Sequence, residues 1–127
     1  METATNLQLV ESYIEAYNRF DVLGMIENFS DEIHFQNIVD DQINLSLLGI
    51  GAFREQALQA TELFSERNQR ILEISEQEDS IEVTIEYTGV LKIDLPNGVK
   101  EGETIQLQGK SIFEFHDNQI VSLKDIS

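Results

Sequence analysis

The stretch SIEVTIEYTGVLKI, residues 80–93, alternates apolar with polar side chains along nearly its whole length. A period of two is typical of a β-strand that buries one of its faces. The pattern returns in TIQLQGKSIFEF, residues 104–115, and the turn signal LPNG separates the two stretches. A tight connection, HDNQ, then leads into a last β-rich segment. The second half therefore predicts long antiparallel strands in series, over residues 70–76, 81–95, 103–116 and 119–126.

The first half of the chain has a helical period instead. In residues 7–18, apolar side chains recur at i, i+3, i+4 and i+7, which is one face of an amphipathic helix. Asp21 is a candidate N-cap for a second, shorter helix, and Gly51 precedes a third. A short strand is predicted at 33–38, followed by a loop. The apolar positions are Val10, Tyr13, Ile14 and Tyr17 in the first helix, Val22, Met25, Ile26 and Phe29 in the second, and Phe53, Ala57, Ala60 and Phe64 in the third.

Two glycines interrupt the strand patterns and bear on the shape of the sheet. Gly89 and Gly109 lie inside alternating stretches, where glycine usually marks a bulge or a sharp bend. A sheet bent at two places can curl around a helix. Helices followed by a curled antiparallel sheet predict an α+β fold, formed by one domain over residues 1–127 with a flexible segment at 1–6.

The composition excludes several classes of partner. The formal net charge is −16, from 24 acidic and 8 basic residues, which disfavours nucleic acids and anionic membranes as partners. No stretch resembles a membrane span or a secretion signal, so we expect a soluble, cytoplasmic protein. There is no cysteine, and His34 and His116 lack any metal-ligand spacing. We therefore expect no metal site and no cofactor.

The alternation along the predicted strands identifies the side chains that face inward, and a few of these side chains are polar. The inward strand positions are mostly aliphatic or aromatic, and an apolar concavity with a few convergent polar groups is the usual composition of a small-molecule site. The polar members are Asn37, Tyr87, Ser111 and Asp125, together with Tyr13 and Tyr17 from the first helix.

Each of these residues also has a purely structural interpretation. Tyrosines at helical spacing are often core residues whose hydroxyl reaches the edge of the core. Asp125 stands two residues before the end of the sequence, where a carboxylate can simply be solvated. If it faces inward instead, an apolar approach would raise its pKa. Asn37 closes an apolar strand face and needs a hydrogen-bonding partner or a ligand.

The layout resembles the nuclear-transport-factor-like superfamily. The resemblance rests on VESYIEAYNRFD, on MIENFSDEIHFQN, on a later helix start and on GKSIFEFHDNQIVSLKD at the end, and it covers residues 7–127. Within the superfamily the chain is most similar to the SnoaL-like polyketide cyclase group. The resemblance implies a cone-shaped α+β barrel, with three helices against a strongly bent sheet around a deep pocket. It also implies a homodimer.

The resemblance allows the chemistry of three related groups to be compared. Ketosteroid isomerases of this superfamily use three catalytic groups: a tyrosine, a carboxylate base and a protonated acid. Tyr13 matches the tyrosine, but Asn37 stands at the base and Ser111 at the second acid. An amide cannot abstract a proton at neutral pH, so isomerase activity of that kind is not expected.

The two other groups retain more of their pattern. Limonene-type epoxide hydrolases match at Asn37 and Asp125, but Phe35 replaces their tyrosine, and Tyr87 and Gly89 replace their arginine and second aspartate. The chain therefore lacks the arginine that would orient Asp125 and the acid that would protonate the epoxide oxygen. Polyketide cyclases rely mainly on one aspartate of the last strand, which Asp125 matches. Of the three chemistries, that of the polyketide cyclases requires the fewest residues that this chain lacks.

We hypothesise a protein that binds a small apolar, ring-containing molecule. Asp125 would act as general acid or base, and Asn37 would hold the substrate or a water molecule. The alternative is a non-catalytic ligand carrier or a homodimeric interaction module. The predicted ligand-binding residues are Tyr13, Tyr17, Phe35, Tyr87, Leu91, Leu107, Ser111, Phe113 and Leu123.

Overall fold

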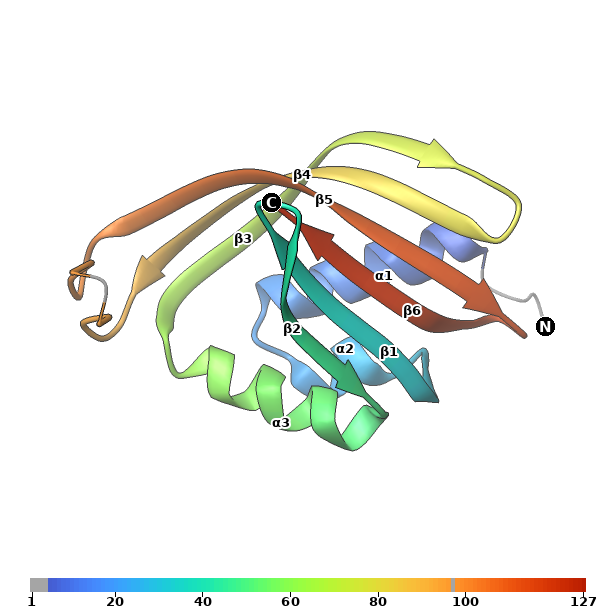
Figure 1. The fold of residues 1–127 in the computed structure, drawn as a ribbon, viewed down its shortest axis with the longest axis horizontal. Helices are drawn as coiled ribbons and strands as arrows, with labels where there is room; N and C mark the ends of the chain where they lie inside the picture. Colours follow the sequence, from blue (N-terminus) through green and yellow to red (C-terminus); the bar gives the residue numbers. More distant parts are fainter. Residues whose placement is uncertain (1–4, 97) are drawn as a thin grey trace.

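A computed structural model describes residues 5–96 and 98–127 of the chain (Figure 1). The predicted flexible segment falls largely on residues 1–4, which lie outside the described residues. The α+β class is confirmed, with the helices on one side of a single bent sheet. In chain order the elements are α1 (Asn6–Asn18), α2 (Val22–Ile26), β1 (Phe29–Val39), β2 (Gln42–Leu48), α3 (Ile50–Thr61), β3 (Phe64–Glu76), β4 (Ser80–Leu91), β5 (Thr104–His116) and β6 (Gln119–Ile126).

The six strands are ordered β2-β1-β6-β5-β4-β3 in the sheet. All neighbours are antiparallel except β1 and β6, which run parallel. The predicted meander of three long antiparallel strands is confirmed, and in the structure it extends from β3 to β6. In Figure 1, β4 and β5 arch over the helices, and α1 lies beneath the arch. The concave face of the sheet is thereby covered at one end by helices.

Local sequence signals explain where the helices begin. Thr5 caps α1 and forms a capping box with Gln8, in which each side chain bonds the other residue's backbone N–H. The predicted cap of the second helix is confirmed, because Asp21 Oδ1 accepts a 3.0 Å hydrogen bond from the Gly24 backbone N–H. The third helix begins after Gly49, whose φ of 97° suits glycine, and not after Gly51 as expected.

The core lies between α1 and the concave face of the sheet. The alternation of the 80–93 stretch is confirmed there, since Ile81, Val83 and Ile85 are all buried. The Tyr13 ring stacks on Phe29 at a centroid distance of 5.5 Å, which joins α1 to the start of β1. The described residues include no helix that is long and apolar enough to cross a membrane.

The structure corrects the sequence analysis in the first half of the sheet. Residues 42–48 were expected in a loop but form strand β2, paired with β1. The hairpin turn is Asp40–Asp41, with φ of 51° and 64°. Two positive φ values are characteristic of a two-residue hairpin, but the usual glycine is missing, so the turn signal was weak. Phe29 and Phe64 belong to strands β1 and β3, and not to the helices that precede them.

Gly89 and Gly109 do not form bulges. The pairing of β4 with β5 runs through both positions without a register shift. Instead, both glycines allow a close approach. A Cβ on Gly109 would lie 2.5 Å from the Ile126 carbonyl oxygen, and one on Gly89 would lie 2.9 Å from the Phe64 ring.

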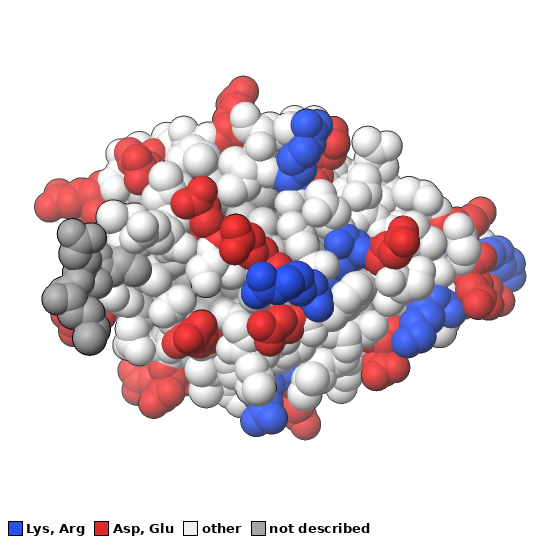
Figure 2. Space-filling view, turned by 180° about the vertical axis from the view of Figure 1, so that it is seen from behind, with Lys and Arg blue, Asp and Glu red and all other residues white. Residues whose placement is uncertain are grey.

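Charge is dispersed on the face seen in Figure 2. Acidic side chains are scattered over that face with basic side chains among them, and no broad patch of one sign appears there. Dispersed charges of this kind are typical of a solvated surface that favours solubility.

Candidate functional site

Two rows of side chains cross the concave face of β1, β6 and β5. Phe35, Leu123 and Phe113 are paired in register across the three strands and form an apolar row. Two residues further along β1 and β6, and two residues earlier on β5, Asn37, Asp125 and Ser111 are paired in the same way. Because side chains on one face recur every second residue, the polar row lies on the same face as the apolar row.

Asp125 is the centre of the polar row. The Ser111 hydroxyl donates a 2.7 Å hydrogen bond to Asp125 Oδ1. Although the residue keeps part of its surface open, protein atoms enclose the carboxyl, and this burial raises the pKa of Asp125 to about 6. The hydrogen bond from Ser111 favours the charged form and acts in the opposite direction. A carboxyl with such a pKa can both accept and return a proton near neutral pH.

Two adjoining cavities meet at this carboxyl. The smaller has a volume of about 200 Å³ and opens toward β3, β4 and β5, where Gln69, Tyr87 and Leu107 line it. The larger has a volume of about 250 Å³ and lies toward the helices. Three residues line both cavities: Tyr17, Asn37 and Asp125.

The structure brings most of the predicted site residues to these cavities. Those that line one or both are Tyr13, Tyr17, Phe35, Asn37, Tyr87, Leu107, Ser111 and Asp125. Leu91, Phe113 and Leu123 are placed elsewhere: they are 1%, 0% and 0% exposed and line neither cavity. Leu123 and Phe113 instead belong to the apolar row beside the polar one, so they support the site from within the core.

The tyrosines of the site stay neutral at ordinary pH. Burial raises the pKa of Tyr13 well above its usual value, and the negative charge of Asp125 adds to the effect. Burial likewise raises the pKa values of Tyr17 and Tyr87. The Tyr17 and Tyr87 rings meet edge to face at a centroid distance of 6.2 Å. These phenols can therefore donate hydrogen bonds but cannot act as bases.

The Asn37 side chain is not engaged in closing a turn. Its side chain makes no hydrogen bond with any residue in the described ranges, although it lines both cavities. Its amide therefore has donor and acceptor groups available to a molecule in either cavity.

Arg67 is a cavity residue that the sequence analysis missed. It is only 6% exposed and lines the larger cavity. The predicted strand began at residue 70, so Arg67 fell outside it, whereas β3 begins at Phe64. Arg67 pairs with Gly89 of β4, and the period of two places Gly89 on the same face as the buried Val83 and Ile85. Counting from that partner would have placed Arg67 inside.

The histidines and the acidic residues form no metal centre in the part of the chain that the structure describes. The His34 ring nitrogen Nε2 lies 3.2 Å from the Ser46 hydroxyl, away from the polar row. His116 is exposed at the β5–β6 turn, 3.3 Å from the Asp117 carboxylate. The candidate site consists of a carboxyl of near-neutral pKa, an amide without a hydrogen bond to any described residue and neutral phenols, all around the adjoining cavities.

The chain belongs to the family of SnoaL-like domains, whose model matches residues 10–123. The resemblance drawn from the sequence is thereby confirmed. A search of curated proteins finds no significant match.

Solved structures share the fold at low sequence identity. One is a putative polyketide cyclase from Xanthomonas campestris, 19% identical with a TM-score of 0.81, covering 95% of this chain and 88% of that chain. A second is an uncharacterised cystatin-fold protein from Novosphingobium aromaticivorans, 15% identical with a TM-score of 0.81, covering 98% and 99%. A third is a hypothetical protein with a ketosteroid isomerase-like fold from Catenulispora acidiphila, in complex with trimethylamine, 12% identical with a TM-score of 0.76, covering 95% and 85%.

Proposed function

We propose that this protein binds a small ring-containing molecule in the adjoining cavities and transfers a proton at it through Asp125. One observation carries the proposal: Asp125 lies where the two cavities meet, and its buried carboxyl has a pKa of about 6. A base is most effective when its pKa lies near the working pH. Membership of the SnoaL-like family, and the putative polyketide cyclase among the similar folds, support the same class of chemistry.

The residues of the polar row suggest how the proton would move. The Asp125 carboxylate takes a proton from a carbon beside a carbonyl group, and the electron pair left on that carbon spreads onto the carbonyl oxygen as an enolate. The Asn37 amide N–H is available to donate a hydrogen bond to this oxygen. The protonated Asp125 then returns its proton to the product. Ser111 positions the carboxyl through its 2.7 Å hydrogen bond.

The proposal can be tested without knowledge of the natural substrate. The probe is 2-tetralone, a ring ketone whose α-hydrogens exchange with deuterium in D₂O when a base removes them, and proton NMR follows the exchange. We expect the protein to accelerate the exchange, and Asp125→Asn to reduce that acceleration by about 100-fold or more, since a positioned base contributes this much. Asp117→Asn is the matched control, because it removes an exposed carboxylate from a turn.

Binding is measured separately from exchange, by chemical-shift changes at Asn37 and Asp125. If 2-tetralone binds but Asp125→Asn exchanges its hydrogens as fast as the wild type, Asp125 has no catalytic role. The protein would then be a non-catalytic ligand carrier. That second candidate is favoured by one observation: among the described residues that line the cavities, Asp125 is the only one with a carboxylic side chain.

A further inference from the structure

Arg67 carries a positive charge into the interior of the protein. The residue is 6% exposed. No ion pair in the described ranges involves it, so no described carboxylate lies within 4.0 Å of its guanidinium nitrogens. Removing a charge from water is costly unless an opposite charge or good hydrogen bonds replace the water. The position of Arg67 therefore calls for a compensating partner.

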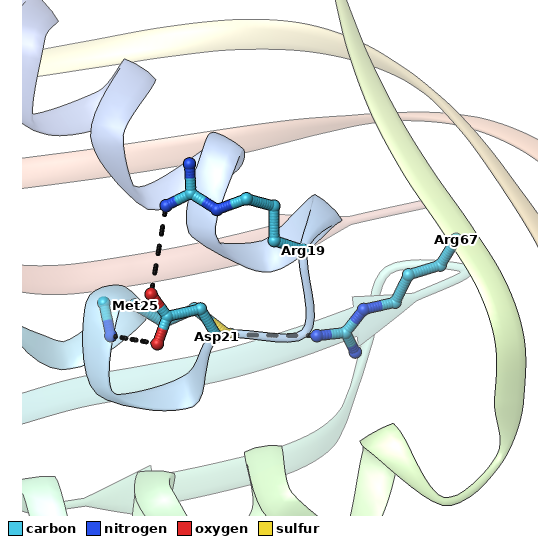
Figure 3. A network of polar contacts seen from close by, with 5 residues as sticks. Arg19, Asp21, Met25 and Arg67 are labelled. Carbon is cyan, nitrogen blue, oxygen red and sulfur yellow. Dashed lines mark hydrogen bonds and ion pairs between the residues drawn. The ribbon is translucent and has the colours of Figure 1, made fainter.

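The contacts that Arg67 does make leave part of its guanidinium unused. Nε donates a 2.9 Å hydrogen bond to the Tyr17 carbonyl oxygen, and Nη2 lies 3.9 Å from the Met25 sulfur (Figure 3), which is a weak acceptor. The guanidinium carbon also lies 3.8 Å from the centre of the Tyr17 ring and 4.5 Å from that of Phe20. These contacts hold the arginine in one orientation.

The unused group is Nη1, which makes no hydrogen bond to any described residue. In the same ranges, every fully buried side-chain nitrogen or oxygen has a partner, so Nη1 must retain contact with open space. The open space that Arg67 lines is the larger cavity. The nitrogen is therefore accessible to a molecule bound there.

Neither of two nearby carboxylates, those of Asp21 and Asp125, compensates the charge of Arg67. Asp21 lies in the same region in Figure 3, but its carboxylate accepts a hydrogen bond from the Gly24 backbone N–H at 3.0 Å and lies 3.8 Å from Arg19. Asp125 lines the same cavity as Arg67, yet no hydrogen bond or ion pair joins them. The rest of the lining is apolar or neutral, including Phe35 and Gln56.

We propose that Arg67 binds a carboxylate of the ligand, so that the molecule that this cavity takes is a ring-containing organic acid. The guanidinium fork presents N–H groups that match the two oxygens of a carboxylate. The aromatic lining, with Phe35 and Phe53, would hold the ring while the carboxylate stays at Arg67. This inference rests on the proposed function, since it assigns the ligand class of the same cavities, and it places the ligand's charge away from the Asp125 carboxylate.

The test compares two probes of nearly the same shape, 2-naphthoate and its neutral amide, 2-naphthamide. Binding is measured by calorimetry and by thermal shift to the wild type, Arg67→Met, Arg67→Lys and Arg70→Met. Methionine keeps an unbranched stem without the charge, and lysine keeps the charge without the fork. Arg70 is the matched control on the same strand: its side chain is 64% exposed and bonds Glu86 at the surface.

We expect the wild type to bind the naphthoate about tenfold more tightly than the amide. Arg67→Met should remove this preference by weakening the naphthoate alone, Arg67→Lys should keep part of it, and Arg70→Met should leave it intact. If folded Arg67→Met retains the preference, or the wild type shows none, the inference is wrong. Should Arg67→Met fail to fold, the wild-type ratio and the response of the Arg67 guanidinium NMR signals to naphthoate decide the matter.

The outcomes separate this inference from the proposed function. Equal binding of both probes, together with Asp125-dependent exchange of 2-tetralone, overturns the role of Arg67 and leaves the function standing. If the naphthoate is preferred in an Arg67-dependent way but the exchange of 2-tetralone does not depend on Asp125, the role of Arg67 stands and the proposed function is overturned. If neither probe binds at all, the ligand class proposed for Arg67 is refuted directly.

Discussion

Asn37 and Asp125 are register partners on the parallel pair of strands β1 and β6, and both line the two cavities. The amide therefore stands beside a carboxyl whose pKa is raised by burial to about 6. A charged group held in this way costs stability, and the cost depends on pH. The first two predictions follow from that dependence.

Asp125→Asn should stabilise the fold above pH 6. Because the pKa of Asp125 is raised from 3.8 to about 6, the folded protein holds the proton more tightly than the unfolded chain. The stability from this group is thus full below pH 3.8 and is lost as the pH rises through 6. We expect a gain of about 1–3 kcal/mol at pH 8 that shrinks toward pH 5.

Urea unfolding at the two pH values measures this gain. Asp117→Asn is the control, since it removes the same charge from a side chain that is 85% exposed. A loss of stability at pH 8 in Asp125→Asn, with Asp117→Asn unaffected, would contradict the buried, high-pKa carboxyl.

Ser111→Ala should raise the pKa of Asp125 further. The serine hydroxyl donates to Asp125 Oδ1 and favours its charged form, so removing the donor leaves burial to act alone. A carbon-13 NMR titration of the Asp125 carboxyl should show its midpoint move upward from about 6. The midpoint of the pH dependence of 2-tetralone exchange, which needs the ionised form, should move with it. Ser122→Ala, on the opposite face of β6, should change neither midpoint.

Gly109→Ala should destabilise the fold through a backbone clash. The added Cβ would lie 2.5 Å from the Ile126 carbonyl oxygen, and a backbone atom cannot move aside cheaply. We expect a loss of about 1–3 kcal/mol, as overpacking typically costs. Gly51→Ala is the control: it lies within α3, where a Cβ meets nothing within 4 Å, so it should stabilise by about 0.5–1 kcal/mol. Equal effects of both variants in urea unfolding would refute the close approach.

Homodimer formation stays a prediction from the family resemblance. The edge strand β2 offers exposed apolar side chains, since Leu48 is 73% and Ile43 61% exposed. Light scattering at micromolar concentration should give twice the chain mass of 14.5 kDa. A monomer under these conditions would contradict this expectation. It would not affect the cavities or the chemistry proposed for them.

The sequence was sufficient for the class of fold because its periods are long and regular. The alternation around Val83 predicted the inner face of β4, and the same reasoning placed Ser111 and Asp125 on one face. It failed where a signal was local and unusual. The turn at Asp40–Asp41 lacks the expected glycine, so β2 was taken for a loop.

The candidate site was only partly predictable for a different reason. Alternation gives the face on which a side chain lies, but not whether that face is packed or open at a given row. Phe113 and Leu123 were assigned to the pocket walls, yet they belong to the fully buried row beside it. Arg67 was missed because the predicted strand began at residue 70 and left it outside, so its inward position became visible only through its pairing with Gly89.

The place of β6 in the sheet has a consequence for how the site comes into being. This strand follows all the others in chain order, yet it lies between β1 and β5. Until it inserts, β1 and β5 present bare edges to other chains, which are the places where β-proteins aggregate during folding. Asp125 lies on that same strand, so only a molecule that has completed its sheet holds the carboxyl that we propose transfers a proton. The proposed activity thus depends on completion of the sheet.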